Sequence, residues 1–359
     1  NALTLTHVNQ LIWLLGQRGW PVKYLRTGAV PDEAKRTQLY RNQIANFAKA
    51  QPDRYQALCF DAILVDEAQD FAPEDFALLL DLIKPHPETG EKTLVLCYDD
   101  AQNLYGRLRP VWRDIGINVA GGDRSRIMRH CFRNSRQTVE LAFNVLTGTQ
   151  APPDLRVHTR QYADVAYLRE HDLITEEVDG FHIHFADRED ELPIVQSFPL
   201  RHAELDWVVA QLLYLIQEEA VRTEDILLLA SKPSAPELDL DYLERQLHVK
   251  LPAIPLYFAT ARENKDQPLL GANRLTFSTV YSAKGYDAPV VFVIGADLFP
   301  YTKEGRAEFY VAATRAKLRL FISGVWRDRS LLGEAAMVRA RLCDALGKTV
   351  DMSLSDKSS

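Results

Sequence analysis

The sequence contains no apolar run that approaches the ~20 residues a membrane-spanning helix needs. Its first ten residues, NALTLTHVNQ, have no basic segment followed by a long apolar stretch, so no secretory leader is indicated. Basic residues are not in excess either: the formal net charge is -7, which excludes a general basic coat for nucleic acid and leaves only a local basic groove. We therefore expect a cytoplasmic protein that does not associate with membranes.

Cysteine is also scarce. The four cysteines, Cys59, Cys97, Cys131 and Cys343, are far apart and show neither a CxxC pair nor a Cys/His ligand spacing. A disulfide framework and a cysteine-based zinc site are therefore not predicted. We expect buried free thiols instead.

What the sequence does have is a regular alternation of short apolar runs with amphipathic helical stretches, which is typical of a parallel sheet covered by helices. A length of 359 residues exceeds what one hydrophobic core usually spans, so two domains are expected. The predicted strands are 62–65, 93–97, 226–230, 275–280, 290–294 and 318–323. Pro73 and Ser135 are predicted to begin two covering helices, and FHIHF at 181–185 is predicted to be a further strand.

The stretch DAILVDEAQDF, residues 61–71, passes from an apolar strand directly into acidic residues. In open α/β sheets ligands bind beyond the carboxyl ends of the strands, which is where Asp66 and Glu67 fall. Asp66 is predicted to hold Mg²⁺, and Glu67 is predicted to act as the base that activates a water. The alternative for this stretch taken alone is a solvated acidic turn.

Further stretches follow in a fixed order: LVLCYDDAQNLYG (94–106), HCFRNS (130–135), TVYSAKGYDAPVVFV (279–293) and FYVAATRAKLRLFISG (309–324). Together with DEAQD (66–70) they resemble motifs two to six of superfamily one DNA helicases of the UvrD/Rep type, over nearly the whole chain. The resemblance implies two RecA-like parallel-sheet domains of the P-loop NTPase fold, with ATP and Mg²⁺ as cofactors.

The resemblance also implies a role for individual residues. It places Gln102 at the terminal phosphate and Tyr105 toward the nucleic acid. It makes Arg133 and Arg315 catalytic arginines that reach the γ-phosphate. It puts Gly285 and Asp287 near the nucleotide, and it puts Thr279 and Tyr281 near the nucleic-acid backbone, where an aromatic ring can stack on any base.

Simpler alternatives remain open for single residues. Arg315 could pair with Glu308 or Asp287, and Arg133 could be a surface arginine at the end of a strand. Tyr105 and Tyr281 could be aromatics at the edge of the core. The ordered set of motifs favours the functional interpretation over these alternatives.

No GxxxxGK[ST] phosphate-binding loop precedes DEAQD. Gly347-Lys348-Thr349 is interpreted as the C-terminal end of a helix, because no strand leads into it. The segment 3–19 resembles the family segment that follows the phosphate loop, so we expect the first domain to be truncated at its N-terminus. The predicted division is 1–125 for the rest of the first domain, 126–350 for the second, and 351–359 for a disordered tail.

The sequence is compatible with two functions, one of an enzyme and one of a binding module. In the first, the intact protein is an ATP-dependent helicase or translocase that moves on single-stranded DNA, and this chain alone is inactive; RNA is left open as the substrate. In the second, the chain is a degenerate or truncated motor that binds nucleic acid or a protein without hydrolysing ATP. A third arrangement supplies the phosphate loop from the missing N-terminal segment or a partner subunit.

Overall fold

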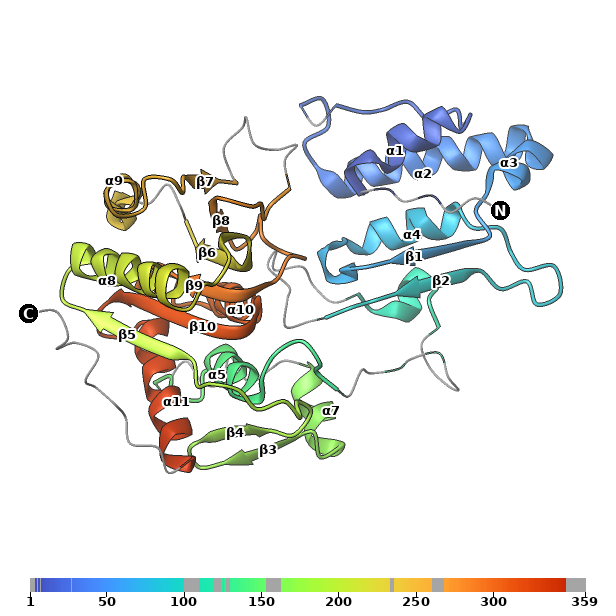
Figure 1. The fold of residues 1–359 in the computed structure, drawn as a ribbon. Coiled ribbons are helices and arrows are strands. Elements are labelled where there is room, and N and C mark those ends of the chain that lie inside the picture. The colour runs from blue at the N-terminus through green and yellow to red at the C-terminus, as the bar shows by residue number, and fades with distance from the viewer. Residues whose placement is uncertain are drawn as a thin grey trace, which may run out of the picture. The chain divides into compact units, whose positions relative to one another are not determined.

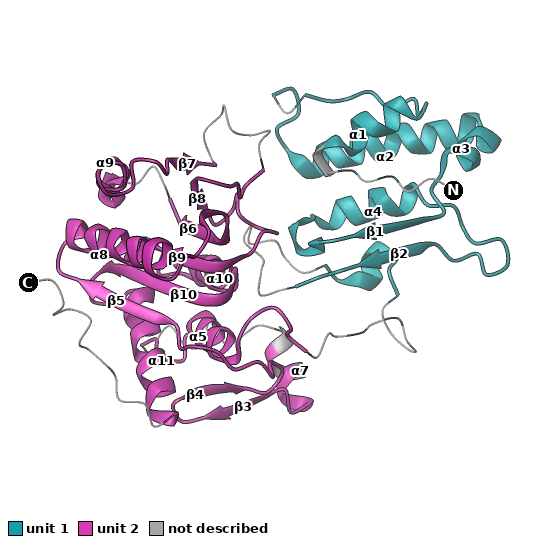
Figure 2. Ribbon diagram, in the orientation of Figure 1, with its two compact units in different colours: residues 1–126 teal, residues 127–359 magenta. Residues whose placement is uncertain are grey.

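The computed structural model describes residues 8–26, 28–99, 110–118, 130–152, 163–232, 236–259 and 268–346, with the single residues Thr4, Thr6, Arg124 and Arg126. The chain divides into two compact units, residues 1–126 and 127–359 (Figure 2). Within the described residues, no helix is both long and apolar enough to cross a membrane. The assignment of the two units as ATPase domains, with the predicted boundaries, stays a prediction.

Unit 1 packs helices against one face of a small parallel sheet. Its elements are α1 (Val8–Gln17), α2 (Glu33–Ala50), α3 (Pro52–Leu58), β1 (Ala62–Val65), α4 (Pro73–Asp81) and β2 (Thr93–Leu96). Asp32 caps α2 by accepting a hydrogen bond from the Lys35 amide at 3.0 Å, and Pro73 begins α4 as predicted. Helices α2 and α4 lie against each other (Figure 1).

The two strands of unit 1 pair in parallel, with Leu64 opposite Val95. Side chains alternate across a strand, so one face of the pair joins the helical core, where Val65 is buried and Ile63 and Leu94 pack. The other face carries Leu64 and Val95, which are 74% and 46% exposed. Among the described residues, only one face of this two-stranded sheet is therefore packed against other elements.

Unit 2 is built on a six-stranded parallel sheet with the order β5-β10-β9-β6-β8-β7 (Figure 1). The strands are β5 (Ile194–Phe198), β6 (Ile226–Ala230), β7 (Leu256–Phe258), β8 (Leu275–Thr279), β9 (Ala288–Val293) and β10 (Ala316–Val325). All five residues of β6 are buried, as expected for a central parallel strand covered on both faces.

Helices cover this sheet on both faces. They are α5 (Arg136–Thr147), α8 (Arg201–Leu213), α9 (Leu240–Lys250), α10 (Lys303–Ala313) and α11 (Leu331–Ala345). A further helix, α7 (Ala163–Glu170), contacts β3 (Ile174–Glu177) instead. Helices α8 and α9 share a core with Ile226 and Leu228 of β6, and α5 and α11 lie on the opposite side of the sheet from α8 (Figure 1). A separate hairpin of β3 (Ile174–Glu177) and β4 (Gly180–Ile183) packs on α5.

The predicted α/β class with a parallel sheet is confirmed. The predicted strands 62–65 and 226–230 match β1 and β6 residue for residue, and the other four are correct to within a few residues. Ser135 caps α5, accepting a hydrogen bond from the Thr138 amide at 3.3 Å. The prediction of buried thiols is wrong for Cys97, which is exposed and continues the face of β2 that carries the exposed Val95. The predicted disordered tail and Gly347-Lys348-Thr349 lie outside the described residues.

Candidate functional site

The acidic turn after β1 is fixed to the neighbouring strand. The Cys97 amide donates to the Val65 carbonyl at 2.9 Å, and the Ala68 amide donates to the Cys97 carbonyl at 2.8 Å. Asp66 lies between these two bonds and is exposed, with one carboxylate oxygen accepting the Glu67 amide at 2.9 Å. An exposed carboxylate on a fixed turn fits a single protein ligand to Mg²⁺, an ion that keeps several of its waters.

Glu67 has an unusual backbone and a defined side-chain partner. Its φ of 52° lies in the left-handed region, which is strained for a residue other than glycine and is often found at functional sites. Gln69 Nε2 donates to Glu67 Oε2 at 2.6 Å, while Gln69 Oε1 accepts the Asp99 amide at 3.0 Å. Gln69 is 1% exposed, so it is a rigid link between the Glu67 carboxylate and the end of β2.

Gln69 was not among the predicted site residues, although it lies within the DEAQD stretch. A glutamine in an acidic turn has no chemical role of its own, and only its burial shows that it orients a carboxylate. Gln102 and Tyr105, which were predicted to contact phosphate and nucleic acid, lie outside the described residues. The described part of the site therefore ends at Asp99 on this side.

In unit 2, segments that are far apart in the sequence meet where β9 and β10 begin. Arg133 Nε lies 3.1 Å from Asp287 Oδ2, and Lys317 Nζ lies 2.6 Å from Asp287 Oδ1. Asp287 immediately precedes β9, and Lys317 is the second residue of β10. The Asp287 carboxylate thus holds two cations at the amino edge of the sheet. Only Arg315 was considered as a partner of Asp287 from the sequence, and the ion pair with Arg133 was not predicted.

Arg315 lies just before β10 and is 1% exposed. Its Nε donates to the Val311 carbonyl at 3.0 Å, and its own carbonyl accepts the Ala288 amide at 3.1 Å. The Asn134 side chain donates to the carbonyls on either side of it, to Thr314 O at 2.8 Å and to Ala316 O at 2.6 Å. The backbone of Arg315 is therefore held from both sides.

Asn134 is a second residue missed among the predicted site residues. It is buried and follows Arg133 directly, so it joins the segment of one predicted catalytic arginine to the peptide groups that flank the other. Buried carbonyls without donors cost roughly 1–3 kcal/mol each, which gives this asparagine a clear structural purpose. Only the tertiary contact over 180 residues of sequence shows it.

Helix α10, which leads to Arg315, is anchored by a buried ion pair. Arg306 Nη1 lies 2.6 Å from Glu334 Oε2 on α11, and the same nitrogen donates to the Val145 carbonyl of α5 at 2.5 Å. Tyr301 donates its hydroxyl to Glu334, and burial together with this bond raises the pKa of Tyr301 to about 12. Three helices are thus fixed to one another beneath the Arg315 segment.

Thr279 and Tyr281 lie at the opposite edge of the sheet. Thr279 ends β8, and its hydroxyl accepts the Ser282 amide at 3.1 Å, which starts the turn that follows. Tyr281 is 41% exposed in this turn. The turn leads through Gly285, whose φ of 84° suits glycine, to Asp287. By the strand register, Thr279 lies at the level of Ile294, so it is roughly 20 Å along the strand direction from Asp287.

Comparison with known proteins adds one sequence match. Residues 254–326 match the family model of the UvrD-like helicase C-terminal domain, a segment that includes Thr279, Tyr281, Gly285, Asp287 and Arg315. The curated proteins gave no match. Among solved structures, the chain is similar to the C-terminal domain of a possible DNA helicase from Lactobacillus plantarum WCFS1, with 17% sequence identity and a TM-score of 0.37 over 57% of this chain and 96% of that one.

Proposed function

We propose that the chain is part of a superfamily one helicase motor, in which two RecA-like domains couple ATP hydrolysis to movement on single-stranded DNA. The observation that carries the proposal is the convergence of Arg133, Asp287 and Arg315 at the amino edge of β9 and β10. The match of residues 254–326 to a helicase domain supports it. In this proposal Asp66 holds Mg²⁺ and Glu67, oriented by Gln69, activates the attacking water.

The arginines would supply the positive charge that phosphoryl transfer requires. Arg133 is half exposed and paired with Asp287, so a γ-phosphate would compete with this carboxylate for the guanidinium. Arg315, by contrast, is held by its hydrogen bond to Val311 of α10 and by the hydrogen bonds of Asn134 to the neighbouring peptide groups. Such a fixed setting suits a group that must keep a constant position. Phosphoryl transfer depends mainly on such positioning and charge neutralisation.

The separation of two sets of residues on one sheet supports a motor. The residues proposed to sense the nucleotide lie at the amino edge, and Thr279 and Tyr281, proposed to contact single-stranded DNA, lie at the carboxyl edge. The turn from Thr279 to Asp287 is a continuous segment of nine residues that links the two edges. Loss of the γ-phosphate at the amino edge would then change the position of the residues proposed to bind single-stranded DNA at the carboxyl edge, because one short segment joins them.

A second candidate is a binding module without ATPase activity. The observation that favours it is Tyr281, which is 41% exposed in the turn after β8, where an aromatic ring can stack on a base without any hydrolysis of ATP. In a motor, a phosphate-binding loop would come from an upstream segment or a partner subunit. The module predicts salt-sensitive binding of single-stranded DNA that ATP does not change.

The deciding experiment is ATP hydrolysis with Mg²⁺, with and without single-stranded DNA, by this chain and by a form extended upstream in its gene. We expect activity only in the extended form. There, Arg315→Lys should lower the stimulated rate at least ~10³-fold, because a catalytic arginine contributes about that much to phosphoryl transfer. The matched control is Arg222→Ala, which removes an exposed arginine paired with Asp225. Silence of both forms, with intact folding by circular dichroism, would favour the binding module.

A further inference from the structure

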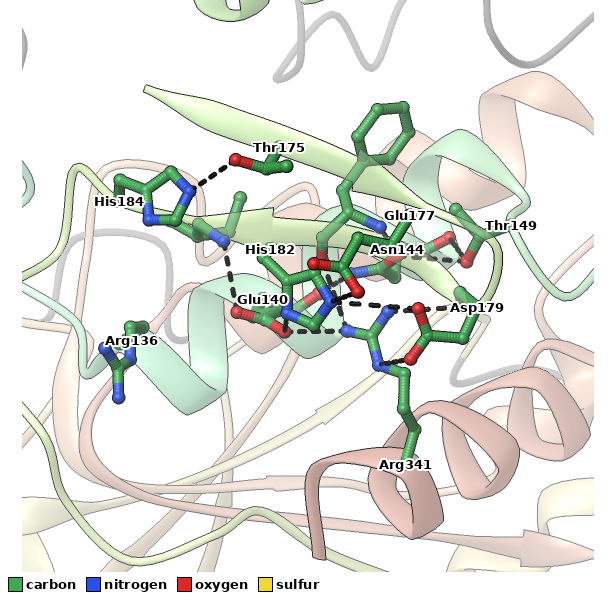
Figure 3. Close-up of polar contacts among 12 residues, drawn as sticks. Arg136, Glu140, Asn144, Thr149, Thr175, Glu177, Asp179, His182, His184 and Arg341 are labelled. Carbon is green, nitrogen blue, oxygen red and sulfur yellow. Dashed lines mark hydrogen bonds and ion pairs between the residues drawn. The ribbon is translucent and has the colours of Figure 1, made fainter. Parts of the chain in front are cut away.

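The hairpin of β3 and β4 brings three metal-ligating side chains together, well away from the predicted motifs in the sequence. Glu177 ends β3, Asp179 lies in the turn, and His182 lies on β4. His182 Nε2 is 3.5 Å from Glu177 Oε2 and 3.7 Å from Asp179 Oδ1, and one ligand atom from each of the three residues lies within 4.8 Å of the others (Figure 3).

These separations suit coordination better than direct hydrogen bonding. The Nε2 atom of His182 is buried and has no hydrogen-bond partner among the described residues. A zinc ion bonds histidine nitrogen at about 2.0 Å and carboxylate oxygen at about 2.1 Å, which puts neighbouring ligand atoms of a tetrahedron roughly 3.3 Å apart. The two measured separations exceed this value by only a few tenths of an ångström.

The second ring nitrogen of His182 faces a buried carboxylate. His182 Nδ1 lies 3.4 Å from Glu140 Oε1, and Glu140 is 6% exposed in its side chain. Arg341 Nη2 donates to the same oxygen at 2.7 Å, and Glu140 Oε2 accepts the Ile183 amide at 3.1 Å (Figure 3). A carboxylate that fixes the far nitrogen of a histidine is the usual outer partner of a metal-binding imidazole.

The turn that carries Asp179 is held in place before any ion binds. Asn144 of α5 donates to the Phe181 carbonyl and accepts the Phe181 amide, both at 2.8 Å, so its amide acts as a neighbouring strand would. Gly180 has a φ of 142°, and a Cβ there would lie 2.4 Å from Asn144 Oδ1 and 2.4 Å from Arg341 Nη1. Only glycine therefore fits this close approach.

The cluster carries more negative than positive charge, so it would attract a cation. Glu140, Glu177 and Asp179 face His182, and the guanidinium of Arg341, whose side chain is 10% exposed, is the cation that the structure describes beside them. With a neutral imidazole, the three carboxylates and one guanidinium leave a net charge of -2. Glu177, Asp179, His182 and Arg341 line a groove with a volume of about 720 Å³, which Asp344 also lines and to which it adds a further negative charge.

We propose that Glu177, Asp179 and His182 bind one divalent metal ion of the zinc class. Imidazole nitrogen with two carboxylate oxygens is a donor set for zinc and related transition ions, whereas Mg²⁺ and Ca²⁺ take oxygen ligands alone. A bound ion fixes the end of β3, the turn and β4 to one another, over a hairpin that packs on α5 and faces Arg341 of α11. The site is independent of the proposed motor function.

The test is a calorimetric titration of the full chain, freed of metal, with Zn²⁺, with Mg²⁺ as a comparison. We expect one Zn²⁺ per chain and a rise in the thermal midpoint with Zn²⁺. Nitrogen NMR of the imidazole should show the signal of His182 Nε2 move on binding.

His182→Ala should lower the affinity for Zn²⁺ more than 100-fold. Glu177→Gln tests the same site without a risk to folding, because that side chain is largely exposed, and should lower the affinity at least 10-fold. His184→Ala is the matched control, since His184 lies two residues away and pairs with the Thr175 hydroxyl at 2.7 Å (Figure 3). Absence of saturable Zn²⁺ binding, or binding that survives both His182→Ala and Glu177→Gln, overturns the proposal.

Discussion

At the scale of single residues, the structure separates side chains that could react from those that position them. Asp66, Glu67, Arg133 and Arg315 have the chemistry of the proposed motor. Gln69 and Asn134 have none, yet each is buried and joins two segments through both ends of its amide or through paired donor bonds. Only burial identifies these two side-chain amides as structural links, because the sequence around each resembles that of any polar turn.

Glu308 on α10 gives a prediction about pH. Its side chain is buried, its Oε1 has no hydrogen-bond partner among the described residues, and burial raises the pKa of its carboxyl, although Ser231 and Lys232 oppose the shift. The folded state therefore keeps this proton at a pH where an unfolded glutamate, with a pKa of about 4.3, has lost it. Stability from this group is present at low pH and is lost as pH rises through the raised pKa.

We therefore expect Glu308→Gln to increase the free energy of unfolding at pH 8 by on the order of 1–2 kcal/mol, with a gain that disappears toward pH 4. Urea unfolding at a series of pH values measures this difference. Glu304→Gln, which changes an exposed carboxylate of the same helix, should stay within about 0.5 kcal/mol. A gain that is constant with pH would contradict the explanation.

At the scale of elements, α5 shows how far a sequence pattern can be followed. It is the covering helix that Ser135 was predicted to begin, and its apolar residues Val139, Ala142, Phe143 and Leu146 are buried. Glu140 and Asn144 are buried as well, because the β3–β4 hairpin packs on the polar side of the helix and takes its hydrogen bonds there. The helix is thus enclosed on two sides rather than one.

The β1–β2 sheet gives a prediction at the same scale. Leu64 lies on the face that the described residues leave exposed, whereas Leu94, on the neighbouring strand, packs into the core of unit 1. Leu64→Thr should change the free energy of unfolding by less than about 0.5 kcal/mol and should reduce self-association and the binding of a hydrophobic dye. The measurements are urea unfolding, light scattering and dye fluorescence.

Leu94→Thr is the control from the opposite face, and it should cost about 1–3 kcal/mol because it places a hydroxyl in packed apolar surroundings. Equal destabilisation by the two substitutions would mean that the face bearing Leu64 is covered in solution.

At the scale of the whole molecule, each of the two units has a hydrophobic core of its own among the described residues. The core of unit 1 centres on Leu15, Ile44 and Phe76, and that of unit 2 includes Leu228 and Phe277 among its buried residues. A core of its own is the main requirement for a domain to fold alone. Unit 2 also contains the whole proposed metal cluster and the Arg133, Asp287 and Arg315 group.

We expect residues 127–359, expressed alone, to fold with helix and strand signals in circular dichroism and one cooperative thermal transition. The same transition should appear in the intact chain, with a midpoint that agrees within a few degrees. Fluorescence of Trp20 and Trp112 is absent from the fragment, so a transition that follows those residues in the intact chain reports unit 1. A fragment without cooperative unfolding would show that unit 2 needs unit 1.

The sequence by itself determined the α/β class, the position of six strands, the first residues of two helices and the order of the motifs. These properties depend on local periodicity and on residue types near one another in the chain, which are visible without a structure. The tertiary structure decided which cations the Asp287 carboxylate holds, which amide binds the Arg315 segment, and that Glu177, Asp179 and His182 lie together, with Glu140 beside His182. Those facts depend on contacts between segments separated by tens to hundreds of residues, and burial at such contacts changes what a polar side chain does.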